Sequence, residues 1–204
     1  NFEIDPFGCE GCGVCSYVCP EDAIEMKEEV AGRYFLSGTD YGPMAHARLE
    51  PGGENSGQLV TAVKGEAEEL ASSNGDDLIL IDGSPGTGCP VIASLANVDL
   101  ALVVAEPTLS GVHDLKRIIE VARQFDVTPL ICINKYDLSG ENTEEIERYA
   151  RSQGIEVVGK IPYSNEVTEA MVDGKSIVET ANGEVKPAIE DIWRKLKRRL
   201  AEVS

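Results

Sequence analysis

Four cysteines near the start of the chain have a spacing that suits metal ligation. They fall within the run CEGCGVCSYVCP and follow the pattern CxxCxxCxxxC, with a proline directly after the last one. Thiolates are soft ligands that bind iron in clusters, and two-residue spacers can turn three sulfur atoms toward one point. The spacing therefore predicts a [4Fe–4S] cluster. The predicted ligands are Cys9, Cys12, Cys15 and Cys19.

Other interpretations of these cysteines fit less well. A disulfide framework is typical of small secreted domains, and this chain has 204 residues. A zinc site usually combines CxxC pairs that are far apart. The run resembles that of bacterial ferredoxins, in which the fourth cysteine can ligate another cluster, so Cys19 closes either this cluster or one with ligands outside these residues. We expect Cys89 and Cys132 to be buried free thiols.

The charge and hydropathy of the chain narrow the range of its partners. The net charge is −18, with 36 acidic and 18 basic residues, and nucleic-acid phosphate would repel such a surface. We therefore expect no nucleic-acid binding. No apolar stretch is long enough to cross a bilayer. An exposed iron–sulfur cluster also favours a reducing compartment, so we expect a cytoplasmic location.

Apolar runs and amphipathic stretches alternate along most of the chain. Helical spacing of apolar residues predicts helices over 58–74, 111–125 and 143–153. Alternation with short apolar runs predicts an α/β fold, with a mostly parallel sheet and helices on both faces. In such sheets, ligands bind beyond the carboxyl ends of the strands. The predicted strands are Leu78–Asp82, Leu100–Glu106, Pro129–Asn134 and Glu156–Ile161.

A second group of residues suited to chemistry follows the first predicted strand. The run LILIDGSPGTGCP places Asp82 after apolar residues and before a glycine-rich turn. A carboxylate at this position can hold Mg²⁺. Glycines such as Gly86 let backbone N–H groups approach phosphate closely. A plain strand-to-helix turn with a capping aspartate explains the pattern equally well.

Several motifs in combination resemble the MinD-type and Mrp-type P-loop ATPases. The run DGSPGTGCPVIASL resembles the family's switch region beside the γ-phosphate, and VAEPT resembles the strand and loop before its next helix. The runs CINKYD and IPYSNEVTEAMVDGKSIVE resemble two loops that border the nucleotide base. The segment Gly42–Val60 is similar to that of the subgroup with an inserted ferredoxin domain.

This resemblance implies a role for five residues. Asp82 would organise Mg²⁺, and Gly86 would offer a backbone N–H near the γ-phosphate. Asn134 would hydrogen-bond the base, with Pro162 and Tyr163 lining its other side. Asn134 could instead cap the turn after the third predicted strand. The sequence pattern itself predicts one short helix after Cys19 and a Gly- and Pro-rich connector with one or two strands over 30–57. Together with the resemblance, this gives a ferredoxin-like [4Fe–4S] segment over 1–29, the connector, and a MinD-like nucleotide-binding α/β domain over 58–204.

The family's phosphate-binding loop, a glycine-rich stretch ending in GK[ST], does not occur in this sequence. By the resemblance, the loop, its strand and the family's first cysteine run would lie before Asn1. Gly174-Lys175-Ser176 spells GKS, but the residue five positions before Gly174 is Glu169 and not glycine, so we interpret it as a helix end and a turn. No lysine is then placed to neutralise the β- and γ-phosphates, and we expect the chain alone to hydrolyse ATP poorly or not at all.

For the intact protein, the resemblance implies an iron–sulfur ATP-binding protein whose ATP hydrolysis is linked to electron transfer or cluster handling. It implies ATP with Mg²⁺ as ligand, a homodimer, and a redox or iron–sulfur partner protein. One alternative is a non-catalytic ferredoxin-type electron carrier with an α/β docking domain. Another is a membrane-positioning ATPase similar to MinD, because the last helix is basic and amphipathic. We favour packing of that helix against the sheet.

Overall fold

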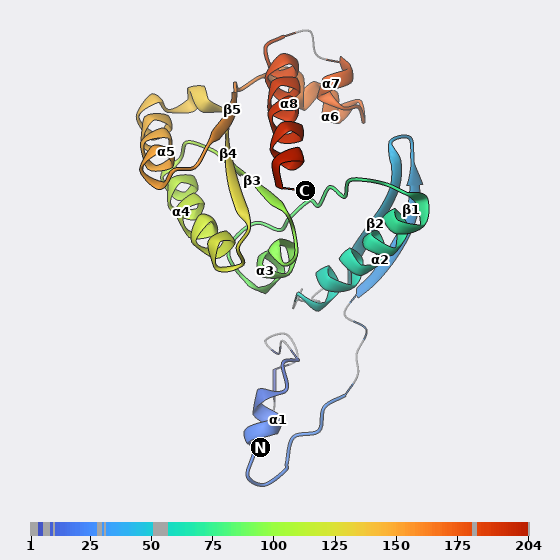
Figure 1. Cartoon of the computed structure of the whole chain (residues 1–204). Helices are drawn as coiled ribbons and strands as arrows, with labels where there is room; N and C mark the ends of the chain where they lie inside the picture. Colours follow the sequence, from blue (N-terminus) through green and yellow to red (C-terminus); the bar gives the residue numbers. More distant parts are fainter. Residues whose placement is uncertain are drawn as a thin grey trace. The chain divides into compact units, whose positions relative to one another are not determined.

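The computed structural model divides by its internal contacts into two units, one up to Ser94 and one from Leu95 (Figure 1). The first unit contains the cysteine segment, a β-hairpin and helices, and the second contains a parallel sheet with its helices. The structure describes residues 4–5, 9, 11–27, 30, 32–50, 57–180 and 183–203.

The first helix, α1 (Val14–Val18), lies between the third and fourth cysteines. The predicted helix after Cys19 is absent from the described residues 19–27, so that prediction is wrong. Cys19 has an extended backbone with ψ of 112°, because the proline that follows it disfavours the helical conformation. Asp22 then has a positive φ of 51°, which also interrupts a helix.

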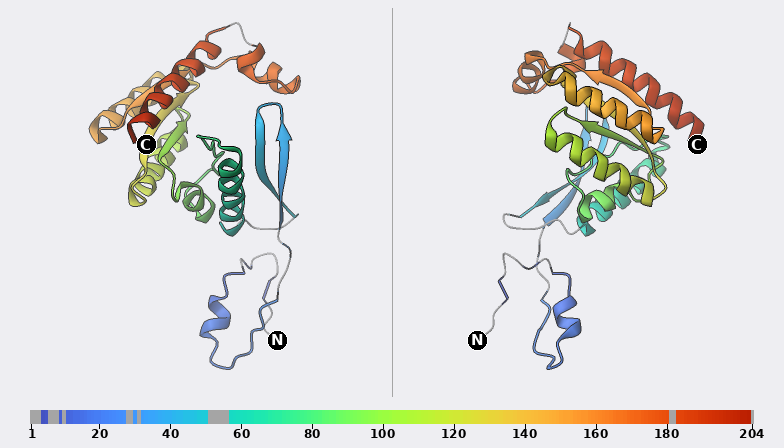
Figure 2. Two further views of the ribbon diagram at one scale, coloured as in Figure 1. Left: turned by 45° about the vertical axis from the view of Figure 1, so that its right-hand side comes forward. Right: turned by 90° about the vertical axis from the view of Figure 1, so that its left-hand side faces the viewer.

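A β-hairpin occupies much of the segment that was expected to connect the cysteines to the next helix. Its strands β1 (Gly32–Thr39) and β2 (Gly42–Leu49) pair antiparallel. The helix α2 (Gln58–Asn74) packs on the hairpin (Figure 2). It is capped by Gly75, which confirms the predicted end of this helix. A shorter helix, α3 (Cys89–Leu95), follows the glycine-rich turn.

Leu78–Asp82 does not form a strand in the structure, so this part of the sheet prediction is wrong. A strand requires a neighbour that takes up its backbone hydrogen bonds. In the part of the chain that the structure describes, β1 pairs with β2, and three later strands form a separate sheet. Leu78–Asp82 joins neither sheet. Leu80 is 87% exposed, which is far from the buried position that its apolar neighbours suggested.

The second unit contains a parallel sheet with the strand order β3-β4-β5. The strands are β3 (Leu100–Ala105), β4 (Thr128–Asn134) and β5 (Val157–Ile161), each starting and ending within one residue of its prediction. The helices of this unit are α4 (Leu109–Gln124), α5 (Gly140–Gln153), α6 (Asn165–Val172), α7 (Ile177–Thr180) and α8 (Val185–Val203), with the 3-10 turn η1 (Tyr136–Leu138).

The central strand β4 sends alternate side chains into two apolar clusters. Ile131 and Ile133 pack with residues of α4 and α5. Leu130 and Cys132 point the other way and pack with Val158 and with α8. Helices therefore cover both faces of the sheet, as predicted, with α4 and α5 on one side and α8 on the other (Figure 1). Burial raises the pKa of the Cys132 thiol to about 11, so it is the buried free thiol that we expected.

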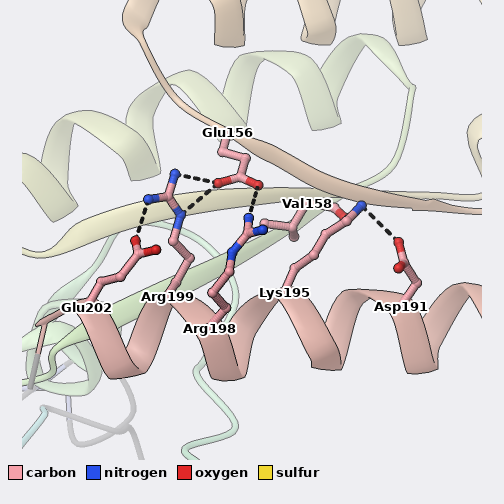
Figure 3. Close-up of polar contacts among 7 residues, drawn as sticks. All are labelled: Glu156, Val158, Asp191, Lys195, Arg198, Arg199 and Glu202. Carbon is pink, nitrogen blue, oxygen red and sulfur yellow. Dashed lines mark hydrogen bonds and ion pairs between the residues drawn. The ribbon is translucent and has the colours of Figure 1, made fainter.

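The basic C-terminal helix α8 is attached to β5 by both apolar and polar contacts. Ile192 is buried in the cluster below the sheet. The guanidinium of Arg199 lies 2.6 Å from a carboxylate oxygen of Glu156, and the ammonium of Lys195 donates to the carbonyl oxygen of Val158 at 2.7 Å (Figure 3). These contacts confirm that the helix packs on the sheet. None of the helices in the described residues is long and apolar enough to cross a membrane.

The contact between β5 and α8 leaves no room for a side chain at Gly159. A Cβ atom there would overlap the buried side chain of Ile192. Gly159→Ala is therefore expected to lower the free energy of unfolding by about 1–3 kcal/mol, measured by urea denaturation. Gly140→Ala is the matched control, because a Cβ at that position meets no atom within 4 Å. Equal stability of the Gly159→Ala protein and the wild type would show that α8 does not pack this closely.

Candidate functional site

The carboxyl ends of the three parallel strands form the edge at which ligands were expected. In the register of the sheet, Asn134 at the end of β4 pairs with Ile161 at the end of β5. Pro162 and Tyr163 follow directly, so the structure brings the predicted base-side residues to one edge. Asn134 is half-buried and Tyr163 is 52% exposed, which leaves both open to a ligand from solvent.

A carboxylate fixes the loops after β4 and β5 to each other. Oδ1 of Asp137 accepts a hydrogen bond from the backbone N–H of Tyr163 at 2.7 Å. The two loops are 26 residues apart in sequence, and this bond holds Tyr163 next to the turn that follows Asn134. Asp137 belongs to the run CINKYD, three residues after the predicted base-binding asparagine. The sequence left open whether this carboxylate contacts the base, and its bond to Tyr163 was not predicted.

An ion pair joins the ends of β3 and β4 in the same way. The Nζ atom of Lys135 lies 2.6 Å from Oε1 of Glu106. Both side chains are more than one third exposed, so the pair adds little to the free energy of unfolding. Its main effect is to fix the positions of the loops after β3 and β4. Lys135 also has a left-handed backbone with φ of 53°, which is uncommon outside glycine and occurs often at functional sites. The amide of Asn142 on α5 further holds this edge by donating to the carbonyl of Pro107 at 3.0 Å.

An open groove of about 400 Å³ borders Pro162 and Tyr163. The start of α6, the residue before α8 and the loop after β5 form its walls. Three of its wall residues are acidic, and their carboxylates would repel phosphate but can accept hydrogen bonds from an amino group. A groove with this charge suits the base of a nucleotide better than its phosphates. The acidic residues are Glu166, Glu169 and Glu184.

Asp82 and Gly86 lie in the first unit, on the turn between the unpaired run and α3. Asp82 is exposed, and Gly86 has φ of 89° with open space where a Cβ would stand. Cys89, at the start of α3, is also exposed, so the expectation that it is buried is wrong. These residues belong to a different unit from Asn134 and Tyr163, and a common nucleotide site therefore stays a prediction. The GKS run lies in the turn between α6 and α7, as interpreted.

The four cysteines of the predicted metal site are free thiols on one loop and helix. Cys9, Cys12 and Cys15 are exposed, and Cys19 is half-buried. Within the described ranges, no three His, Cys, Asp or Glu side chains are grouped as they would be around a metal ion, so these thiols must turn toward one another to ligate. Gly13, with φ of 73°, caps α1 in a conformation that glycine adopts easily.

The donor set nevertheless fits an iron–sulfur cluster. The backbone N–H of Ala23 donates to Sγ of Cys19 at 3.4 Å. This bond and the N–H group of Glu21 lower the pKa of the Cys19 thiol, which favours the thiolate form that binds metal. Hydrogen bonds to sulfur are also one means by which proteins tune such clusters. Four free thiols with this spacing can therefore hold a [4Fe–4S] cluster.

Known proteins are similar to both parts of the chain. A family profile for a 4Fe-4S binding domain matches residues 2–25. An uncharacterized protein of Methanocaldococcus jannaschii is 34% identical over 197 residues, which is 97% of this chain and 66% of the relative. An uncharacterized ATP-binding protein of the same organism is 27% identical, over 59% of this chain and 48% of its own length. An iron-sulfur cluster carrier protein of Pyrococcus furiosus is 26% identical, over 62% and 47%.

A solved structure has the same fold. The MinD cell division protein of Aquifex aeolicus superposes with a TM-score of 0.61 at 21% identity, over 79% of this chain and 68% of that protein. The chain belongs to the MinD/Mrp-type superfamily of P-loop ATPases. Within this MinD/Mrp-type superfamily, it is a member with a ferredoxin-like segment. It spans between about half and two thirds of the length of the relatives named above.

The bond between Asp137 and Tyr163 gives a direct test of the loop arrangement. Asp137→Ala removes the acceptor, and the amide hydrogen of Tyr163 is expected to exchange about fivefold faster, because about 1 kcal/mol of local stability is lost. Asp137→Asn keeps an acceptor oxygen of the same size and is the control. Nuclear magnetic resonance can follow this single amide. The arrangement is contradicted if Tyr163 exchanges at the same rate in the Ala variant and the wild type.

Proposed function

We propose that the chain acts in an iron–sulfur ATP-binding protein in which ATP hydrolysis by the intact protein is coupled to electron transfer or cluster handling. One observation carries the proposal: a cysteine run matched by the 4Fe-4S profile shares its chain with a MinD-like sheet. The names of two relatives, an ATP-binding protein and an iron-sulfur cluster carrier protein, support both halves.

In this proposal, the cysteine segment holds the cluster through four thiolates. When bound, a [4Fe–4S] cluster supplies a one-electron redox centre. The segment has little packing of its own, since α1 contains no buried residue. Three of the thiols are exposed, which suits exchange of an electron or a cluster with a partner protein. The proposed ligands are Cys9, Cys12, Cys15 and Cys19.

The base of ATP would lie at the carboxyl edge of β4 and β5. The side-chain amide of Asn134 offers both a donor and an acceptor, as the edge of a purine requires. Pro162 and Tyr163 would line the other side of the base, beside the acidic groove. The bond from Tyr163 to Asp137 occupies one oxygen of that carboxylate, so Asp137 would position the loop and not read the base through this atom.

The phosphates would meet the turn at Asp82 and Gly86. The Asp82 carboxylate would hold Mg²⁺ directly or through water, and the backbone N–H of Gly86 would face the γ-phosphate. Phosphoryl transfer depends on positioning and on cations that stabilise the developing charge. The sequence contains no GxxxxGK[ST] loop, so the lysine of that loop has no counterpart among these residues.

The metal half of the proposal is tested by iron analysis of anaerobically prepared protein. The wild type is expected to contain about four iron atoms per chain and to absorb visible light as [4Fe–4S] proteins do. Cys12→Ser and Cys15→Ser are expected to lose most of this iron, because serine does not replace a soft thiolate ligand. Cys89→Ser and Cys132→Ser are the controls and should retain it. Wild-type protein that is colourless and free of iron contradicts the proposal.

The nucleotide half predicts that the chain alone has no ATPase activity above the buffer background. The reason is the absence of a phosphate-loop lysine, which P-loop NTPases use to stabilise the transferred phosphoryl group. Release of inorganic phosphate from Mg–ATP measures this directly. Release of phosphate by this chain well above the buffer background would show that other residues supply the missing cation.

A further inference from the structure

The β-hairpin of the first unit has two faces, and one of them packs on α2 (Figure 2). A Cβ atom on Gly32 of β1 would stand 3.2 Å from the side chain of Leu59 on α2. A hydrogen bond from the Tyr34 hydroxyl to Glu66 of α2 raises the pKa of Tyr34. Successive side chains of a strand point to opposite faces, so the odd-numbered residues of β1 point away from α2.

The register of the hairpin defines the face that points away from α2, which we call the outer face. Residues directly opposite each other in an antiparallel pair lie on the same face, so each odd-numbered residue of β1 shares the outer face with its partner on β2. Every residue of this face belongs to the described part of the chain. The outer face consists of Arg33, Phe35, Ser37, Thr39, Gly42, Met44, His46 and Arg48.

The charge of the outer face is opposite to that of the unit around it. The sequence up to Ser94 contains 17 acidic residues and only four basic ones. The outer face has two of these four basic residues, Arg33 and Arg48, and none of the acidic ones. A surface of this kind attracts carboxylates, which most of the rest of the unit repels.

The two arginines stand directly opposite each other, an arrangement that destabilises the hairpin. Arg33 pairs with Arg48 in the register, and like charges in opposed positions weaken an antiparallel pair. Glu50 offsets Arg33 in part, since its Oε1 atom lies 3.7 Å from Nε, but the Arg33 side chain is 70% exposed. Among the described residues Arg48 has no ion pair. The fold does not explain this pair, whereas an anionic partner would.

Apolar groups lie beside the arginines on the outer face. The Phe35 ring stacks on His46 with centroids 5.4 Å apart, and Nε2 of His46 forms a hydrogen bond of 2.9 Å with the Ser37 hydroxyl. Phe35 is nevertheless 41% exposed, and Met44 is 45% exposed. Aromatic residues, methionine and arginine are enriched at the cores of protein–protein interfaces. Because the stack already orders the Phe35 ring, a partner that covers it loses little side-chain entropy.

We propose that the outer face of the hairpin docks a partner protein through an acidic, partly apolar surface of that partner. Carboxylates of the partner pair with Arg33 and Arg48, and its apolar side chains cover Phe35 and Met44. Two copies of this chain that met through the same face would bring four arginines together, which disfavours a two-fold dimer across it. The inference goes beyond the function proposed above and requires neither a bound cluster nor a nucleotide.

Titration of the isotope-labelled full chain with short peptides tests the docking face. The probes are EELEELEE and hexaglutamate, which have the same number of carboxylate side chains, and hexalysine as the control of opposite charge. EELEELEE is expected to shift the backbone amides of residues 33–37 and 44–48 with one saturation curve. It should bind about threefold more tightly than hexaglutamate, because its leucines cover apolar surface. Added salt should weaken the binding, and hexalysine should leave these amides unchanged.

Variants of the arginines show whether they carry the binding. Arg48→Gln is expected to weaken the binding of EELEELEE by about threefold, and the double variant Arg33→Gln/Arg48→Gln by about tenfold or more, because charge-assisted contacts are lost. Arg48→Lys keeps the positive charge and should bind within about twofold of the wild type. The matched control Arg148→Gln removes an exposed arginine from α5 and should bind as the wild type does.

The stability of the hairpin separates docking from a structural role. Arg48→Gln relieves the repulsion between opposed arginines, so the amides of β2 should exchange hydrogen no faster than in the wild type. Faster exchange in this variant would assign Arg48 to the fold and overturn the inference. Equal affinity of the double variant and the wild type for EELEELEE also overturns it. So does a shift of the outer face by phosphatidylglycerol vesicles and not by the acidic peptides, which would indicate a membrane surface.

Discussion

The burial of strand β4 on both faces determines the geometry of the second unit. Ile131 and Ile133 face α4 and α5, while Leu130 and Cys132 face α8, and each of these four is at most 2% exposed. A parallel strand with both faces covered has little freedom to shift its register, because a slip by one residue would exchange the two sets of side chains. The register with β5 then sets which residues meet at the carboxyl edge.

The polar contacts at that edge depend on this arrangement. Lys135 reaches Glu106 and Asp137 reaches the N–H of Tyr163 only because β3, β4 and β5 end side by side. Neither contact is strong, since both are open to solvent. Their effect is to hold three loops in one relation to each other, so that Asn134 and Tyr163 lie at the same edge of the sheet. The packed sheet supplies the stability, and the loops carry the polar side chains of the proposed base site.

The sequence predicted the helices and strands in which the spacing of apolar residues shows which face is buried. The apolar runs of β3, β4 and β5 and the periodic stretches of α2, α4 and α5 were predicted because the same residues that form each element also bury it. Leu78–Asp82 has an equally apolar run, but a strand depends on a neighbour, and this one does not pair in the structure. The helix predicted after Cys19 does not form, because Pro20 disfavours a helical conformation at Cys19 and Asp22 has a positive φ. The contact of Asp137 with Tyr163 joins residues 26 positions apart, and no local pattern indicates it.

The proposed base site at the edge of β4 and β5 is the part of this account on which the nucleotide chemistry depends. Titration of isotope-labelled protein with adenosine, followed by nuclear magnetic resonance, tests it most directly, because adenosine needs no phosphate loop. The account predicts that the backbone amides of Asn134 and Tyr163 and the side-chain amide of Asn134 shift with a common saturation curve. Shifts confined to other parts of the chain, or no shifts at concentrations that saturate related proteins, would contradict it.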